Sequence, residues 1–131
     1  MSDAGILDTS VVIDLLGIDD ALLPAESAIT AVTLAELAAG SLATSDVIQR
    51  SIRQERVQWA EATFDALPFD IAAARSYGRV YALVRAARRE PRGRLADLMI
   101  ASIAAANGLP LYTRNPTDFA GLESLVTVIA V

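Results

Sequence analysis

Four short, largely apolar runs predict β-strands that are buried in a sheet. They cover residues 5–7, 27–32, 109–113 and 125–131. Strands of a parallel sheet are covered on both faces, so they are apolar along their whole length instead of alternating with polar residues. These four segments therefore indicate the core of a mainly parallel sheet.

Between the first strands, apolar residues recur at helical spacing. Residues 10–16 predict a helix closed by Gly17. A second helix is expected to open at Thr33 and to stop at Gly40, where glycine can take up a left-handed cap. The first half of the chain thus predicts two strand-helix units.

The second half of the chain is mostly helical in pattern. Residues 44–67 predict either one long helix or a hairpin of two helices, ended by Pro68. Asp70 is expected to cap the next helix. Residues 95–106 form a helix that is apolar nearly all round, hence buried, and Gly108 ends it.

Strands that alternate with helices predict a parallel sheet covered on both faces. The chain has 131 residues, of which 53% are hydrophobic and 21% charged, a balance typical of a globular domain. We therefore expect one α/β domain over residues 1–131, with a central, mainly parallel sheet of four or five strands flanked by helices.

The residue types present restrict the chemistry. There is no cysteine and no histidine, which excludes disulfides, thiolate zinc sites and a histidine base. A metal ion would have to be held by oxygen atoms, and oxygen ligands favour Mg²⁺ or Mn²⁺ over zinc or copper.

The chain shows no pattern of membrane insertion or export. Its longest apolar stretch, residues 98–106, is far shorter than the roughly 20 residues of a spanning helix. The N-terminus lacks a basic segment followed by an apolar one. We expect a cytoplasmic protein with no membrane contact.

Net charge of −5 argues against a nucleic-acid partner, but the distribution of charge changes this picture. All eleven basic residues are arginine, and five of them fall within ten positions: Arg85, Arg88, Arg89, Arg92 and Arg94. This cluster is either a solvated helix end that complements the helix dipole or an RNA-binding surface.

Four carboxylates are candidates for a common site. Asp8 ends the first strand, and Asp118 lies in the loop after the strand at 109–113. Glu36 and Asp97 lie in the first turns of helices expected to start at the same edge of the sheet, where ligands of open α/β sheets bind. Carboxylates crowded together repel one another unless a cation neutralises them.

Each of these carboxylates also has a purely structural explanation. Asp8 could cap the following helix, and Glu36 stands at the spacing of a capping box from Thr33. Asp97 could complement a helix dipole, and Asp118 could stabilise a turn. For three aromatic residues we expect a place in the core: Trp59, Tyr77 and Tyr81.

In combination, four segments resemble the PIN-domain family, specifically VapC-type toxins. They are residues 7–13 (LDTSVVI), 33–37 (TLAEL), 94–101 (RLADLMIA) and 113–119 (TRNPTDF). The resemblance implies a PIN-like three-layer fold. It also implies a homodimeric, Mg²⁺- or Mn²⁺-dependent endoribonuclease that cleaves tRNA or rRNA. A cognate antitoxin would silence it in a heterotetramer or larger complex.

The resemblance also implies roles for single residues. Three positions match the core acidic residues of the family: Asp8, Glu36 and Asp97. Either Asp118 or Asn115 would supply the fourth ligand, directly or through water, and Glu36 too would bind directly or through water. The hydroxyls of Thr9 and Thr113 would orient the carboxylates or the attacking water.

Two other classes of protein remain as alternatives. A noncatalytic PIN-like module could use the acidic crevice to bind a partner protein. A magnesium-dependent phosphoacceptor receiver domain also combines aspartates with a parallel sheet, but such domains rely on a lysine near the site, and this chain contains no lysine.

Overall fold

Five parallel strands form one sheet in the computed structural model, which describes residues 3–131. Met1 and Ser2, the first residues of the N-terminus considered above, lie outside this range. The strand order is β3-β2-β1-β4-β5. The strands are β1 (Ala4–Leu7), β2 (Glu26–Thr30), β3 (Asp65–Leu67), β4 (Leu111–Thr113) and β5 (Val128–Ala130). The predicted parallel α/β sheet is confirmed.

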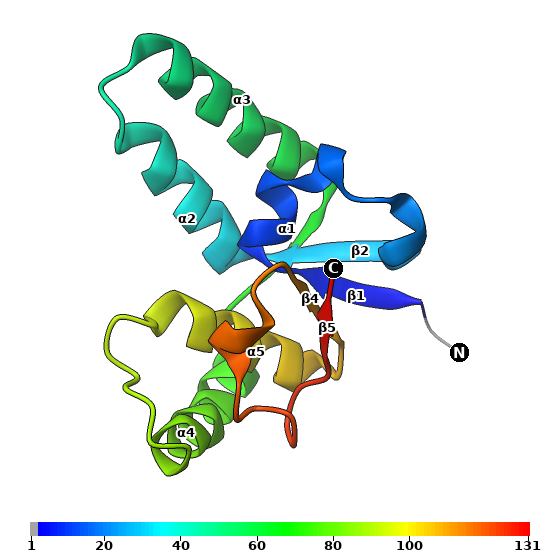
Figure 1. The fold of residues 1–131 in the computed structure, drawn as a ribbon, viewed down its shortest axis with the longest axis vertical. Coiled ribbons are helices and arrows are strands. Elements are labelled where there is room, and N and C mark those ends of the chain that lie inside the picture. Colours follow the sequence, from blue (N-terminus) through cyan, green and yellow to red (C-terminus); the bar gives the residue numbers. More distant parts are fainter. Residues whose placement is uncertain (1–2) are drawn as a thin grey trace.

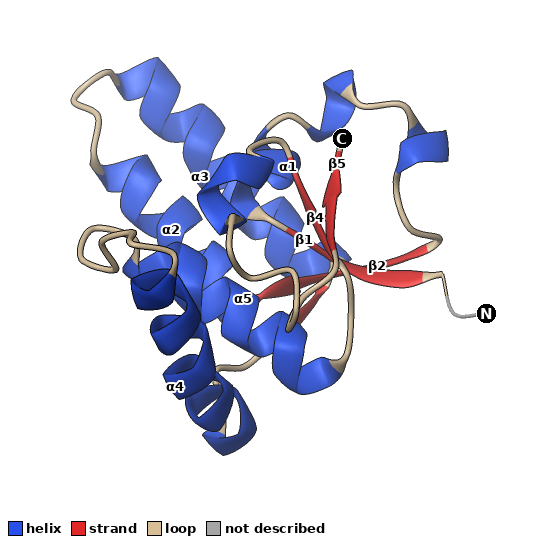
Figure 2. Ribbon diagram, turned by 60° about the horizontal axis from the view of Figure 1, so that its bottom comes forward, coloured by secondary structure: helices blue, strands red, loops and turns tan. Residues whose placement is uncertain are grey.

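Helices cover both faces of the sheet, as Figures 1 and 2 show. The α-helices are α1 (Thr9–Ile13), α2 (Ala31–Leu42), α3 (Val47–Thr63), α4 (Ile71–Ala86) and α5 (Leu95–Asn107). Three 3₁₀ helices accompany them: η1 (Leu15–Gly17), η2 (Asp20–Leu22) and η3 (Pro116–Phe119). The α2 and α3 helices form an antiparallel hairpin that projects beyond the sheet (Figure 1). No helix within residues 3–131 is long and apolar enough to span a bilayer.

Neighbouring residues of β1 point into two separate cores. Ile6 packs in a cluster with Val80 of α4 and Leu98 of α5. Leu7 packs on the opposite face, in a cluster that contains Val11 of α1 and Ala60 of α3. Successive side chains of a strand alternate between the faces of a sheet, so a strand that is apolar at both positions needs cover on both sides. The result is the expected three-layer arrangement.

The strand β3 lies where the pattern predicted helix. α3 ends at Thr63, and Phe64 already has an extended backbone, so the helical prediction for residues 44–67 is wrong at its end. Asp65–Leu67 pairs with β2, in the register Ala28↔Asp65 to Thr30↔Leu67. A strand of three residues has no visible period, and it is the pairing with β2 that makes it a strand.

Two helix boundaries also differ from the prediction. The N-cap of α2 is Thr30, whose hydroxyl accepts a hydrogen bond of 3.1 Å from the Thr33 backbone N–H, and the helix continues through Gly40. The helix expected over residues 10–16 divides into α1 and η1. By contrast, Asp70 caps α4 and Gly108 ends α5 with a φ of 62°, as predicted.

The carboxyl ends of β1 and β4 meet at a topological switch point. From β1 the chain proceeds through β2 to β3, and it then returns past β1 to form β4 on the other side. A crevice opens where crossovers on the two sides diverge, and ligands of open α/β sheets bind there. Asp8 directly follows β1, and Arg114 directly follows β4.

Candidate active site

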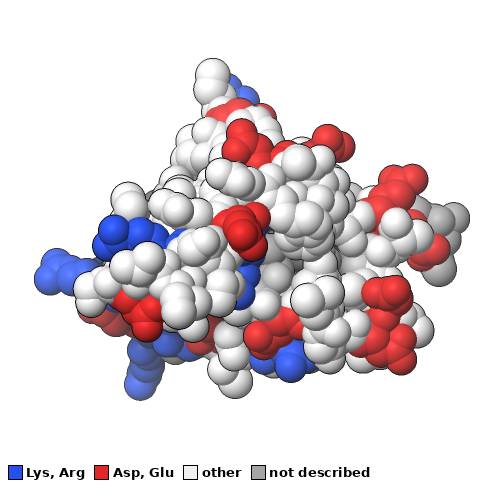
Figure 3. All heavy atoms as spheres, turned by 90° about the horizontal axis from the view of Figure 1, so that it is seen from above, with Lys and Arg blue, Asp and Glu red and all other residues white. Residues whose placement is uncertain are grey.

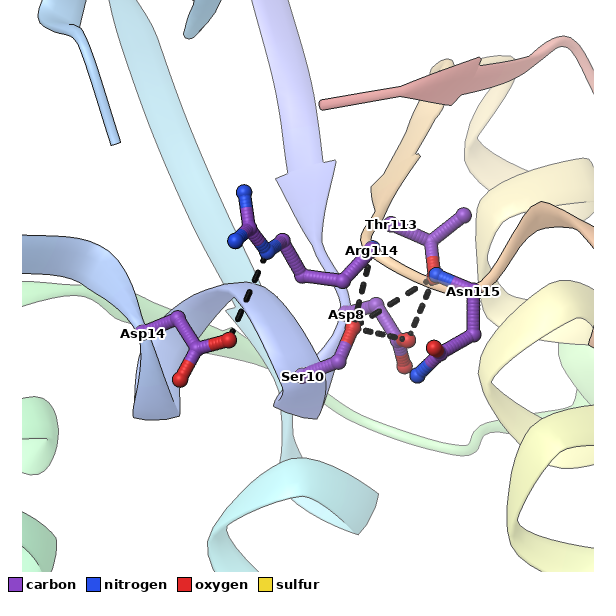
Figure 4. Close-up of polar contacts among 6 residues, drawn as sticks. All are labelled: Asp8, Ser10, Asp14, Thr113, Arg114 and Asn115. Atoms are coloured by element: carbon purple, nitrogen blue, oxygen red, sulfur yellow. Dashed lines mark hydrogen bonds and ion pairs between the residues drawn. The ribbon is translucent and has the colours of Figure 1, made fainter. Parts of the chain in front are cut away.

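Asp8 is held at the switch point by two hydroxyl groups. Its Oδ2 atom accepts hydrogen bonds of 2.8 Å from both Ser10 Oγ and Thr113 Oγ1 (Figure 4). Its side chain makes no capping bond to α1, so the interpretation of Asp8 as a side-chain cap is wrong. No hydrogen bond from a described residue reaches Oδ1, which leaves this oxygen available to a ligand.

The start of the loop after β4 is tied to the same two hydroxyls. The backbone N–H of Arg114 donates to Ser10 Oγ at 3.1 Å, and that of Asn115 donates to Thr113 Oγ1 at 3.0 Å. The Arg114 side chain turns away to pair with Asp14 at 3.4 Å (Figure 4). Ser10 was not among the predicted site residues. Its position two residues after a strand-ending aspartate was the signal that could have identified it.

Glu36 is held by a different threonine from the one its spacing suggested. Thr9 Oγ1 donates a hydrogen bond of 2.6 Å to Glu36 Oε1 and lies 2.9 Å from Thr33 Oγ1. Because the N-cap of α2 is Thr30, the capping box of Thr33 and Glu36 does not form. The side chain of Glu36 thus joins α2 to the residue that follows Asp8.

Asp97 shows that the four predicted carboxylates share one electrostatic environment. Its side chain is half-buried in the first turn of α5, and its pKa is raised from 3.8 to about 6. Burial is the largest cause, followed by the negative charges of Asp8, Asp118 and Glu36, while Arg94 partly offsets them. No described residue donates a hydrogen bond to the Asp97 carboxylate. It therefore depends on solvent or a cation for compensation.

Asp118 lies in η3, and two arginines of the predicted RNA-binding cluster hold this segment. Arg89 Nη1 donates to the carbonyl oxygens of Thr117 and Ala120, at 2.6 and 3.3 Å. Arg94 Nη1 donates to the Asp118 carbonyl at 3.3 Å. The Asp118 side chain accepts no hydrogen bond from a described residue, so the turn is stabilised by its backbone and by the arginines.

The end of α4 has a backbone conformation that brings Arg89 against η3. The N–H of Arg89 donates to Val84 O and that of Arg88 to Arg85 O, the two bonds of a Schellman motif. Arg88 occupies its left-handed position, with a φ of 60°. Gly121 follows η3 with a φ of 94°, and an added Cβ there would lie 3.1 Å from Ala87 Cβ. The helix end and the loop are therefore in close contact.

The three remaining arginines of the cluster, Arg85, Arg88 and Arg92, are exposed. Their role in RNA binding stays a prediction. In Figure 3 the largest group of basic side chains lies at the left of the face, smaller groups lie near its centre, at the top and at the lower edge, and acidic side chains are scattered. Trp59 is 44% and Tyr81 40% exposed, so their expected place in the core is wrong. Tyr77 does pack against the core.

The donor set fits a hydrated divalent cation better than a fully enclosed one. Within residues 3–131, no three acidic side chains are arranged as a ready-made metal cage. The free oxygens of Asp8 and Asp97 nevertheless lie at a rim where negative charges raise the pKa of Asp97. Mg²⁺ usually retains several waters and takes only one or two carboxylates directly. Such an ion would relieve the repulsion without a preformed cage.

Fold and site together define an α/β protein with an acidic site at the switch point of a parallel sheet. The chain belongs to the PIN domain family, whose model matches residues 5–122. It is 40% identical over 130 residues to Ribonuclease VapC5 of Mycobacterium tuberculosis, covering 95% of this chain and 92% of that protein. The family predicted from the four segments is confirmed.

Solved structures give the same result for the fold. VapBC-5 of Mycobacterium tuberculosis, a member of the VapBC family of toxin-antitoxin systems, matches with a TM-score of 0.87 and 39% identity, covering 98% of this chain and 99% of the other. FitAcB of Neisseria gonorrhoeae matches with a TM-score of 0.76 and 25% identity, covering 95% of both chains. VapBC2 of Rickettsia felis, at 18% identity and a TM-score of 0.77, covers 98% of both chains and supports the fold alone.

Proposed function

We propose that this chain is an endoribonuclease that hydrolyses phosphodiester bonds with the help of Mg²⁺ or Mn²⁺, and that it is the toxin of a toxin-antitoxin pair. A relative that is 40% identical over most of the chain is named a ribonuclease. Structural relatives are members of toxin-antitoxin systems. The acidic site at the switch point is chemically suited to the reaction.

The observation that carries this proposal is the raised pKa of Asp97. A carboxyl group whose pKa reaches about 6 because of burial and three neighbouring carboxylates is destabilised in its charged form. Strongly perturbed carboxyls of this kind cluster at functional sites. A bound divalent cation would offset the unfavourable repulsion and favour the ionised form of Asp97.

The proposed ligands are Asp97 and the carboxylates whose charges raise its pKa. Asp8, Asp97 and Asp118 would ligate the cation, and Glu36 would do so directly or through water. When bound, the cation lowers the pKa of a coordinated water and neutralises charge that develops on the scissile phosphate.

The hydroxyl residues around the site would fix the orientation of these ligands. Ser10 and Thr113 hold Oδ2 of Asp8, so its other oxygen has a fixed direction. Thr9 does the same for Glu36. Asn115 would bind a water or a phosphate oxygen. Its side chain lies near Asp8 in Figure 4 and makes no hydrogen bond with a described residue.

The substrates and partners are proposed at the level of class. The RNA would be tRNA or rRNA, the chain would form a homodimer, and a cognate antitoxin would assemble with it into a heterotetramer or larger complex. The VapBC2 proteins of Rickettsia felis are bound to a DNA fragment from their promoter. A complex of the present chain with its antitoxin would be the species to test for such binding.

The test is cleavage of total tRNA and rRNA by the purified chain with Mg²⁺, with Mn²⁺ and with EDTA. Asp8→Asn removes a proposed ligand, and Glu61→Gln, on an exposed position of α3, is the matched control. We expect metal-dependent cuts by the wild type and by E61Q, and none by D8N. Binding of Mn²⁺ without cutting of any RNA would instead favour the noncatalytic partner-binding module.

A further inference from the structure

A small pocket of about 220 Å³ lies next to Glu36, between α1, α2 and α3. Glu36 and Thr9 form part of its wall, and Arg53 and Arg56 of α3 also line it. The pocket thus brings two guanidinium groups to the edge of the acidic site. Neither arginine belongs to the cluster at residues 85–94.

The two arginines have different surroundings. Arg53 Nη1 donates a hydrogen bond of 2.9 Å to the carbonyl of Gly40, which ties α3 to α2. Arg56 follows three residues later, a spacing that puts it on the same face of the helix. Its side chain is half-buried, and within the described residues it makes no hydrogen bond and no ion pair.

Arg56 is half-buried as a residue, and its guanidinium, which has no protein acceptor, stays accessible to solvent. Arginine carries five N–H donors in a planar fork and stays charged at every physiological pH. Its donors at this position can reach only water or a ligand. Arg56 also lines a larger groove of about 700 Å³, whose other lining residues include Trp59, Arg114 and the acidic Asp14 and Glu55. It therefore lies between this groove and the pocket beside Glu36.

We propose that Arg56 binds a backbone phosphate of the RNA strand next to the phosphate that is cleaved, with Arg53 contributing positive charge behind it. The proposal rests on the proposed ribonuclease function. A phosphate fits better than a neutral ligand because the planar fork of arginine matches two phosphate oxygens. The positive charge of Arg56 also attracts the RNA at a place where the acidic rim would otherwise repel a polyanion. Arg56 is a positioning residue, because it binds a phosphate that does not react.

The experiment measures binding of a short single-stranded RNA in EDTA, so that the strand stays intact, by fluorescence anisotropy over a series of salt concentrations. Arg56→Gln should weaken binding roughly tenfold at low salt. The slope of log affinity against log salt should decrease by about 0.7, the value for one phosphate of a single strand. Arg56→Lys should retain the slope and lose part of the affinity, since it keeps the charge but not the fork.

Arg79→Gln, at an exposed position of α4, is the matched control and should bind like the wild type. A second probe places one uncharged methylphosphonate at successive positions of the RNA. At the position bound by Arg56 this change should weaken the wild type but not R56Q. Circular dichroism of each variant checks that it is folded.

The outcomes separate the two proposals. If the wild type cleaves RNA but R56Q binds with unchanged affinity and slope, the phosphate site is overturned and the ribonuclease function stands. If the wild type neither binds nor cleaves any RNA, both are overturned. If R56Q keeps RNA binding but loses binding of an acidic peptide that the wild type binds, the pocket accepts a protein carboxylate instead of a phosphate.

Discussion

Thr113 donates a hydrogen bond of 2.8 Å to the Oδ2 atom of Asp8, and this bond joins the carboxyl ends of β4 and β1. Thr113 is fully buried and Asp8 is 5% exposed. A hydrogen bond between a neutral donor and a buried carboxylate is stronger than one between neutral groups. The two residues stand 105 positions apart in the chain, so the geometry of the site depends on the sheet.

Replacement of Thr113 by valine is expected to affect both stability and activity. Valine has nearly the same shape but cannot donate to Asp8 or accept from the Asn115 N–H. We expect the free energy of unfolding to fall by about 1–3 kcal/mol. Cleavage should fall roughly tenfold to hundredfold, as for other residues that orient metal ligands. Denaturant unfolding and RNA cleavage assays measure the two effects.

Thr113→Ser is the control for this prediction, because it keeps the hydroxyl and loses only a methyl group. Its activity should stay close to that of the wild type. Equal activity of T113V and T113S would show that the hydroxyl does not orient Asp8.

Replacement of Asp97 by asparagine should stabilise the protein at neutral pH. The folded-state pKa of about 6 lies above the ordinary value of 3.8 for an aspartate, so between these values the folded state binds more protons than the unfolded chain. Wild-type stability therefore falls as pH rises from about 4 to 6 and has lost this contribution fully above 6. D97N lacks this titrating carboxyl group. Above pH 6 its free energy of unfolding should exceed that of the wild type by about 1–2 kcal/mol, a value reduced for solvent screening at the rim.

Thermal or urea unfolding between pH 4 and pH 8 measures this difference, with Glu61→Gln as the control for a change of carboxyl to amide. The advantage of D97N should disappear near pH 4. A D97N variant with a collapsed circular dichroism spectrum, or with lower stability at pH 8, would show that Asp97 has a structural role.

Binding of Mn²⁺ should release protons in a pH-dependent way. At pH 6 about half of the Asp97 carboxyl groups carry a proton, which a cation must displace. We expect release of up to about half a proton per ion at pH 6 and almost none at pH 8. Titration calorimetry in two buffers of different ionisation enthalpy gives this number. D97N should abolish the pH 6 release even where it still binds the ion, and an unchanged release would assign the proton to another group.

Replacement of Arg89 by glutamine should loosen the segment that carries Asp118. The change removes hydrogen bonds to the carbonyls of Thr117 and Ala120. We expect the free energy of unfolding to fall by about 1 kcal/mol and the backbone amides of η3 to exchange faster with solvent. Hydrogen exchange measures the local effect, and Arg85→Gln is the exposed control from the same cluster. A lower salt dependence of RNA affinity in R89Q, with unchanged exchange, would instead support the RNA-binding interpretation.

Much of the site could be predicted because its residues follow local rules. Asp8 and Asp118 come directly after, or shortly after, strands of a parallel sheet. Asp97 lies in the first turn of α5 and Glu36 in the second turn of α2. Two of their partners were expected from the resemblance, since Thr113 donates to Asp8 and Thr9 donates to Glu36. Ser10 was not, because it resembles an ordinary helix-start residue in the sequence, and only the packed structure shows that it holds the Asp8 carboxylate.

The arginines illustrate the limit more clearly. Five of them are close together in the chain, a pattern that left open a solvated helix end or an RNA-binding surface, but Arg89 and Arg94 donate to backbone carbonyls around Asp118. Arg56 stands outside this cluster and lines the pocket beside Glu36. Proximity in sequence does not determine which acceptor a long, flexible side chain finds.

By itself, the sequence determined the parallel α/β class, the family and the oxygen-only chemistry of the site, because these depend on local period, motif spacing and the residue types present. The tertiary structure decided the rest. It made Asp65–Leu67 a strand through pairing with β2 and joined Asp8 to Thr113 across the switch point. It also raised the pKa of Asp97. Strand pairing, burial and charge repulsion all arise between residues far apart in the chain, so no local pattern contains them.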